Sequence, residues 1–289
     1  FGGAGTGGYN LYVQRLTNPA GCTPIAFGAT LSGSIDVAAE ADCFTFTGAS
    51  GDRTRVRVVR TSGTTTPFIE IVRPDGSTLC GTVVGEMTCL LDANGTYTVL
   101  VKDFGGTGTG GYNLYVQRLN SPVGCMPIAF GSTLSGSIGV AAETDCFTFN
   151  GVSGNQARVA VLGTSGTLTP FQEVLRPDGS TLCGTIMGQL TCLLDTTGTY
   201  SILVRDFGGP NLGGYTLTIN VVVPPPPTVP VLVSPPNGSL VIDYTPLINW
   251  NNSTVPGGTT FDHYQLQVAT DIAFSGIVID VNVPDSEYT

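Results

Sequence analysis

The sequence predicts an all-β chain built of tandem β-sandwiches, and three observations support this fold class. The chain is rich in Gly (40) and Pro (19), with only 11% charged residues, a composition typical of short strands joined by tight turns. Apolar and polar residues alternate over short segments, with no capped helical pattern. A unit of 103 residues also occurs twice in succession.

The repeat is visible as Phe-Gly-Gly, which begins at Phe1, Phe104 and Phe207. Residues 1–103 and 104–206 are identical at roughly 70% of positions. The third copy of the motif opens only a short tail, so the folded unit is expected to begin near Cys22 rather than at Phe1. Residues 1–19 are therefore predicted to be the last strand of a preceding unit, and residues 20–121 and 122–222 to be two complete sandwiches. A Pro-rich linker at 223–229 then leads to a partial domain at 230–289.

Each unit contains clear strand and turn patterns. Phe44 and Phe46 alternate with polar residues, and a second alternating segment follows near Val56. Pro74-Asp75-Gly76 predicts a turn, because Pro fixes φ and Gly accepts a positive φ. About eight such strands in roughly 100 residues is the spacing of a sandwich.

The order of these motifs resembles the bacterial pre-peptidase C-terminal (PPC) family over residues 20–222. The motifs are Asp42-x-Phe-x-Phe, Pro74-Asp75-Gly76, Gly95-Thr-Tyr and Gly110-Gly-Tyr-x-Leu. The resemblance implies jelly-roll-like or immunoglobulin-like sandwiches on a secreted bacterial protein, and it supplies no activity. Four cysteines per unit depart from the family's general pattern.

The C-terminal segment resembles a bacterial fibronectin type III domain. The resemblance rests on three segments: Ser234-Pro-Pro-Asn-Gly-Ser, Thr245 to Trp250, and Tyr264 to Ala269. It implies that Trp250 is a core residue of an early strand. The match ends before the last strands of that fold.

Eight cysteines occur, four in each unit, which allows three pairings per unit. We favour pairing the first with the second, to hold the leading segment on the first core strand, and the third with the fourth, to clamp a short hairpin. These residues are Cys22, Cys43, Cys80 and Cys89, with Cys125, Cys146, Cys183 and Cys192. Zinc is the alternative, but the units lack His and a Cys-x-x-Cys pair. Disulfides indicate an oxidising compartment, so an extracellular or cell-surface location is expected.

Charge argues against several partners. The net charge is −10 with a single lysine, which disfavours nucleic acid and anionic membranes. No apolar run approaches the roughly 20 residues that span a bilayer, so no membrane insertion is expected.

No catalytic, cofactor-binding or metal-binding set emerges, and the chain is expected not to be an enzyme. The single His263 is interpreted as a strand-edge residue rather than part of a Ser-His-Asp triad. The Gly-x-Gly-x-x-Gly pattern at Gly106 precedes a strand instead of a helix, so it is interpreted as a hairpin connection. Repeated Asp residues suit calcium only if they converge, and turn roles are the simpler interpretation.

One segment differs sharply between the copies. Arg53, Arg55 and Arg57 alternate along one strand and are followed by Arg60, whereas the second copy keeps only Arg158. A basic stripe in so acidic a chain is a candidate contact with an acidic neighbour, and drift on a solvated face is the alternative. Four sequons are candidate glycosylation sites: Asn94, Asn237, Asn251 and Asn252.

The function expected from these observations is structural. The units are near-duplicates, are expected to be cross-linked by disulfides and contain no catalytic set. These features suit an extracellular stalk, filament or surface fibre that associates with copies of itself. Strand addition is one means of joining the copies. The alternative is an accessory region of a secreted hydrolase or adhesin that binds extracellular polysaccharide. That alternative calls for exposed aromatic residues, of which Tyr9, Tyr12, Tyr112 and Tyr115 are the paired candidates.

Overall fold

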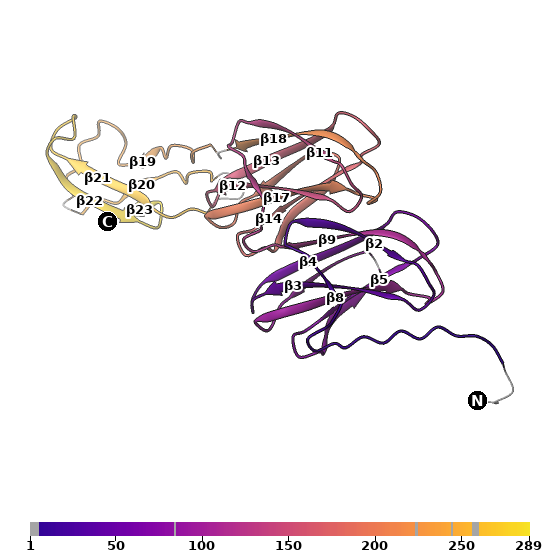
Figure 1. The fold of residues 1–289 in the computed structure, drawn as a ribbon. Helices are drawn as coiled ribbons and strands as arrows, with labels where there is room; N and C mark the ends of the chain where they lie inside the picture. Colours follow the sequence, from indigo (N-terminus) through magenta and orange to yellow (C-terminus); the bar gives the residue numbers. More distant parts are fainter. Residues whose placement is uncertain (1–5, 84, 223–224, 244, 256–259) are drawn as a thin grey trace. The chain divides into compact units, whose positions relative to one another are not determined.

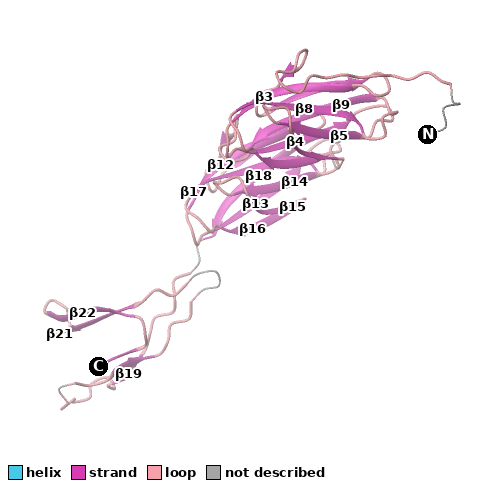
Figure 2. Ribbon diagram, turned by 90° about the horizontal axis from the view of Figure 1, so that it is seen from below, coloured by secondary structure: helices cyan, strands magenta, loops and turns pink. Residues whose placement is uncertain are grey.

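A computed structural model of the protein describes residues 6–83, 85–222, 225–243, 245–255 and 260–289. Every regular element in these residues is a β-strand, which confirms the all-β prediction (Figures 1 and 2). No helix there is long and apolar enough to cross a membrane. The chain divides into two compact units, Phe1–Val222 and Val223–Thr289.

The first unit contains two sandwiches of the same topology. In the first sandwich, a five-stranded sheet β1-β3-β8-β5-β6 faces a four-stranded sheet β2-β9-β4-β7. The strands are β1 Thr23–Pro24, β2 Ala29–Ile35, β3 Ala41–Gly48, β4 Arg53–Arg60, β5 Pro67–Val72, β6 Thr78–Thr82, β7 Glu86–Leu90, β8 Gly95–Asp103 and β9 Gly110–Arg118. Pairing is antiparallel except between β1 and β3.

The second sandwich repeats this arrangement with sheets β10-β12-β17-β14-β15 and β11-β18-β13-β16. Its strands are β10 Met126–Pro127, β11 Thr133–Ile138, β12 Thr144–Gly151, β13 Gln156–Gly163, β14 Pro170–Leu175, β15 Thr181–Ile186, β16 Gly188–Leu193, β17 Gly198–Asp206 and β18 Gly213–Val222. The PPC-like resemblance therefore falls on two β-sandwiches.

Alternating side chains fill each core. In the first sandwich Phe46 stacks on Tyr97 with ring centroids 5.6 Å apart, and Tyr112 is fully buried. Gly33 lies on the neighbouring strand, where a Cβ would come within 2.4 Å of the Tyr112 ring. The buried Tyr112 hydroxyl donates a hydrogen bond to Asp42. Tyr112 and Tyr115 are both buried, so they cannot serve as an exposed glycan platform.

Four disulfides join Cys22–Cys43, Cys80–Cys89, Cys125–Cys146 and Cys183–Cys192, and the described residues include no free cysteine. The expectation that Cys80–Cys89 clamps a hairpin is wrong. β6 and β7 belong to different sheets, so this bond ties the two layers of the sandwich together. The alternating pattern did not reveal that the chain changes sheets between these cysteines.

The predicted turn and connection residues have local roles. Asp75 accepts a hydrogen bond from the Ser77 amide at 2.8 Å, and Gly76 has a φ of +88°. Asp103 accepts bonds from the amides of Thr107 and Gly108, which closes the Gly-rich connection between β8 and β9. The described residues include no group of three His, Cys, Asp or Glu side chains that could hold a metal ion.

The second unit contains sheets β19-β20-β23 and β21-β22. The strands are β19 Leu232–Ser234, β20 Ile248–Trp250, β21 Tyr264–Ala269, β22 Ile277–Val283 and β23 Glu287–Tyr288. Trp250 is buried and packs edge-on against Tyr264, with ring centroids 5.3 Å apart. The fibronectin-like assignment of this unit stays a prediction.

The N-terminal segment is extended but is not a strand. Within residues 6–22 no residue pairs in a sheet, while the beginning of the predicted strand, residues 1–5, lies outside the described part. Its assignment to a preceding sandwich stays a prediction.

Candidate functional site at the contact between the two sandwiches

Strand β4 of the first sandwich has both faces covered. Val56 and Val58 point into the sandwich core, and the intervening Arg55 and Arg57 point out of it. Arg55 and Arg57 are nevertheless only 7% and 5% exposed. Charged residues are rarely buried without partners, so the neighbours of these two guanidinium groups define a candidate site.

The principal partner of Arg55 is Glu173 of strand β14, in the second sandwich. Arg55 Nη2 donates to Glu173 Oε1 at 3.1 Å, and Nη1 donates to Oε2, which makes the pair bidentate. Glu173 is itself only 5% exposed and accepts a further bond from the Thr181 hydroxyl. The four-stranded sheet of the first sandwich therefore packs on the five-stranded sheet of the second.

Glu86 of strand β7 extends this pair into a network. Its carboxylate lies 3.6 Å from Arg55 Nε, 3.6 Å from Arg57 Nε and 3.1 Å from Nη2 of Arg205 on β17. Arg57 also donates to the Asp206 carbonyl at 2.7 Å. Burial and the neighbouring Arg205 charge lower the pKa of Arg57 to about 10, so it stays protonated at neutral pH.

Apolar contacts continue the interface beside the charges. Leu119, directly after β9, packs in a buried cluster with Leu175 and Leu203 of the second sandwich, next to the Cys125–Cys146 disulfide. Within the second sandwich, Arg205 lies over the Phe171 ring, 4.3 Å from its centroid, which holds its guanidinium group beside Glu86. Ion pairs and a small apolar cluster thus hold the two sandwiches face to face.

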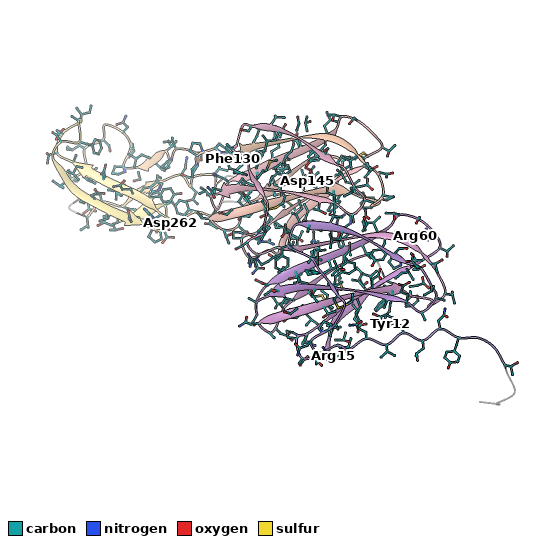
Figure 3. The ribbon with its side chains drawn as sticks, in the orientation of Figure 1. Tyr12, Arg15, Arg60, Phe130, Asp145 and Asp262 are labelled. Carbon is teal, nitrogen blue, oxygen red and sulfur yellow. A yellow bond between two sulfur atoms is a disulfide. The ribbon has the colours of Figure 1, made fainter. Side chains whose placement is uncertain are left out.

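The other predicted residues lie outside this charged network. Arg53 is half-buried near Asp178, whereas Arg60 is exposed at the end of β4 and donates to the Thr65 carbonyl (Figure 3). The structure thus brings Arg55 and Arg57 into one network and leaves Arg60 outside it. His263 is bonded to its neighbour Asp262 at 2.8 Å, through groups exposed on the second unit. The four sequon asparagines are all exposed: Asn94, Asn237, Asn251 and Asn252.

Sequence reasoning did not select Glu86, Glu173 or Arg205. One signal was present in the repeat, because Arg57 and Glu86 become Ala160 and Gln189 in the second copy. Loss of a cation and an anion together indicates that the two are partners.

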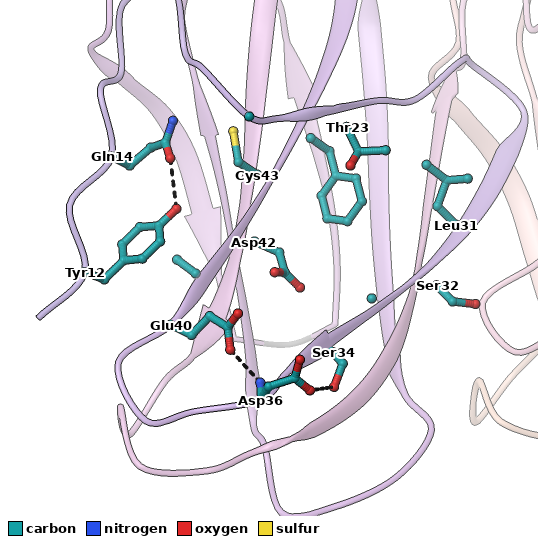
Figure 4. Close-up of a pocket in the computed structure, with 14 residues that line it drawn as sticks. Tyr12, Gln14, Thr23, Leu31, Ser32, Ser34, Asp36, Glu40, Asp42 and Cys43 are labelled. Atoms are coloured by element: carbon teal, nitrogen blue, oxygen red, sulfur yellow. Dashed lines mark hydrogen bonds between the residues drawn. The ribbon is translucent and has the colours of Figure 1, made fainter. Parts of the chain in front are cut away.

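A second candidate is a shallow pocket on the first sandwich (Figure 4). Tyr12 and Gln14 of the extended segment line it together with Glu40, Asp42 and Asp36. Two of these carboxylates accept hydrogen bonds from nearby groups. Glu40 accepts one from the Asp36 amide at 2.6 Å, and Asp42 accepts one from the Tyr112 hydroxyl. Each of these two carboxylates thus accepts a hydrogen bond from within the first sandwich.

No protein-family model and no curated protein match the sequence. Among solved structures, PliG of Aeromonas hydrophila, a periplasmic inhibitor of g-type lysozyme, is 18% identical, with 34% of this chain and 96% of that chain covered and a TM-score of 0.29. The pre-peptidase C-terminal domain of a Bacillus anthracis collagenase is 20% identical, with 35% and 99% covered and a TM-score of 0.28. The A223 turret protein of Sulfolobus turreted icosahedral virus is 9% identical, with 68% and 98% covered and a TM-score of 0.20.

Acid is expected to loosen the interface. Burial alone would raise the pKa of Glu173, but Arg55 outweighs it, and the pKa lies below its usual value. A carboxylate with a depressed folded pKa contributes stability that is present above its unfolded pKa of about 4.3 and is lost as the pH falls through the folded value.

The measurement is urea unfolding of the wild type and Glu173→Gln between pH 7 and pH 3. The difference in stability between them should shrink as the pH falls. The pKa of Asp145 is raised by burial, an effect of opposite sign that is present in both proteins and cancels. A difference that stays constant down to pH 3 would contradict the role assigned to the Glu173 charge.

Proposed function

We propose that this chain is a non-enzymatic structural protein of the extracellular space, a stalk or filament subunit of stacked β-sandwiches. The observation that carries the proposal is the buried Arg55–Glu173 pair, which fixes one repeat on the next. A flexible string of independent domains would not bury charged residues between its members. Four disulfides support an oxidising, extracellular setting.

The chemistry of the site suits this role better than catalysis. The charged groups at the interface are paired with one another and enclosed between sheets, so none is presented to a substrate. The exposure of the four candidate glycosylation sites is compatible with a surface protein. Association with further copies of the repeat, by strand addition among other contacts, is part of the proposal.

Electron microscopy of the native material tests this proposal. We expect elongated particles or fibres in which sandwiches recur at a constant spacing and orientation. Monomeric particles whose sandwiches take variable orientations would contradict it. A pull-down on insoluble glycans distinguishes the alternative, because a polysaccharide-binding region would be retained and a structural stalk would not.

A further inference from the structure

The N-terminal extended segment has the same sequence as a core strand. Residues 8–16 and 111–119 are identical at all nine positions. In the second range, alternate side chains are fully buried within the first sandwich: Tyr112, Leu114 and Val116. Their counterparts are exposed by 87%, 78% and 81%: Tyr9, Leu11 and Val13. One side of residues 8–16 is thus an apolar strand face without a core to fill.

The opposite side of this segment is already docked. Asn10 Nδ2 donates to the Ala38 carbonyl at 3.0 Å, and Asn113 Nδ2 donates to the Ala141 carbonyl at 2.9 Å. Asn113 and Ala141 each lie 103 residues after Asn10 and Ala38, respectively. The segment therefore touches the first sandwich as β9 touches the second.

Two further contacts repeat with the same offset. Leu16 packs at Gly76, and Leu119 packs at the corresponding Gly179. The pocket of Figure 4 also has a counterpart between the sandwiches. Tyr12, Gln14 and Asp42 line the pocket of Figure 4. The residues 103 positions later, Tyr115, Gln117 and Asp145, line the pocket between the sandwiches. Residues 8–16 thus occupy, on the first five-stranded sheet, the place that β9 and Leu119 occupy on the second.

The same sheet carries the charges that the interface uses. Glu70 stands at the position of Glu173, and Lys102 at that of Arg205. Lys102 Nζ and Glu70 Oε2 are 3.3 Å apart, with side chains 42% and 19% exposed. A guanidinium group placed over this sheet as Arg55 is placed over the second would meet Glu70.

We propose that the five-stranded sheet β1-β3-β8-β5-β6 is a docking surface for a further sandwich of the same repeat, whose last strand is residues 8–16. This inference rests on the proposed structural function and identifies the partner. The occupant is not the second sandwich of another copy. Its corresponding sheet has Ala160 and Gln189 where the interface needs Arg57 and Glu86, and Thr218 where it needs Tyr115. Stacking through this contact therefore has a direction.

The test extends the full chain by a second copy of residues 20–103 placed directly before Phe1, which reproduces the natural junction between Asp103 and Phe104 and leaves a single copy of residues 8–16. Amide hydrogen exchange is then compared at residues 8–16 and 111–119, distinguished by the different residues that follow them. Identical sequence gives identical intrinsic rates, so the second range is an internal reference. In the extended chain, protection of residues 8–16 should rise by ~1,000-fold, toward that of the reference.

Charge reversal separates docking from strand completion. In the extended chain, Glu70→Arg should increase the maximum dimension measured by small-angle scattering, while residues 8–16 stay protected. Glu173→Arg should increase the same dimension through the existing interface. Unprotected residues 8–16 in an extended chain with all its disulfides formed would overturn the proposal. An increase in maximum dimension on Glu173→Arg but not on Glu70→Arg would also overturn it. So would dimers of the unextended chain whose population rises with protein concentration.

The two proposals fail in different ways. If Glu173→Arg changes nothing because the existing sandwiches already move independently, the structural function fails. If the existing sandwiches are held rigidly and only the added one does not dock, the function stands and this inference alone is wrong.

Discussion

Replacing Glu173 by alanine is expected to destabilise the contact between the two sandwiches by about 3–5 kcal/mol, the usual effect of removing one member of a buried ion pair. Arg55, which is only 7% exposed in the wild type, would keep the half-buried Glu86 as its nearest remaining anion. The measurement is urea unfolding. The wild-type sandwiches should unfold together, and the variant should show two transitions or a lower midpoint.

The repeat provides a matched control. Glu70 occupies the same position in the first sandwich, where it pairs with the exposed Lys102. Glu70→Ala should therefore cost less than ~1 kcal/mol, as exposed pairs do. A double-mutant cycle between Arg55→Ala and Glu173→Ala should show coupling. Equal effects of Glu70→Ala and Glu173→Ala would show that the buried pair does not hold the sandwiches together.

Alternation and turn chemistry sufficed to predict the strands. The side chains of Phe44 and Phe46 point into a core, and the Asp75-Gly76 turn forms where it was expected. These features are local, since each depends on residues a few positions apart. Alternation also placed Arg55 and Arg57 on one side of a strand, although it did not indicate whether that side meets water or protein.

The partners of that stripe could not be predicted by local reasoning. Arg55 and Glu173 are separated by 118 residues, and their contact depends on how whole sheets stack. Local sequence also does not decide the structure of residues 8–16 and 111–119. Their nine residues are identical, but 111–119 form a buried strand and 8–16 an exposed segment. A strand needs neighbours to bond to, and the sequence of the strand itself does not supply them.

Removing the Cys125–Cys146 disulfide is expected to cost more than removing Cys22–Cys43. Both bonds join residues 21 apart, so the loop-closure contribution is the same, about 3 kcal/mol each. Their surroundings differ. Cys146 is 8% exposed within the apolar cluster formed by Leu119, Leu175 and Leu203, whereas Cys22 and Cys43 are only half-buried.

The comparison uses paired Cys→Ala variants unfolded in urea without reductant. Loss of Cys22–Cys43 should lower the stability of the first sandwich alone. Loss of Cys125–Cys146 should lower that of the second by about 1 kcal/mol more, because a buried cluster loses contacts, and should also weaken the contact with the first sandwich. The two bonds serve as each other's control, since sequence separation and position in the fold are matched. Equal losses would mean that the Leu119 cluster adds nothing to the stacking, leaving the ion pairs alone to hold the repeats together.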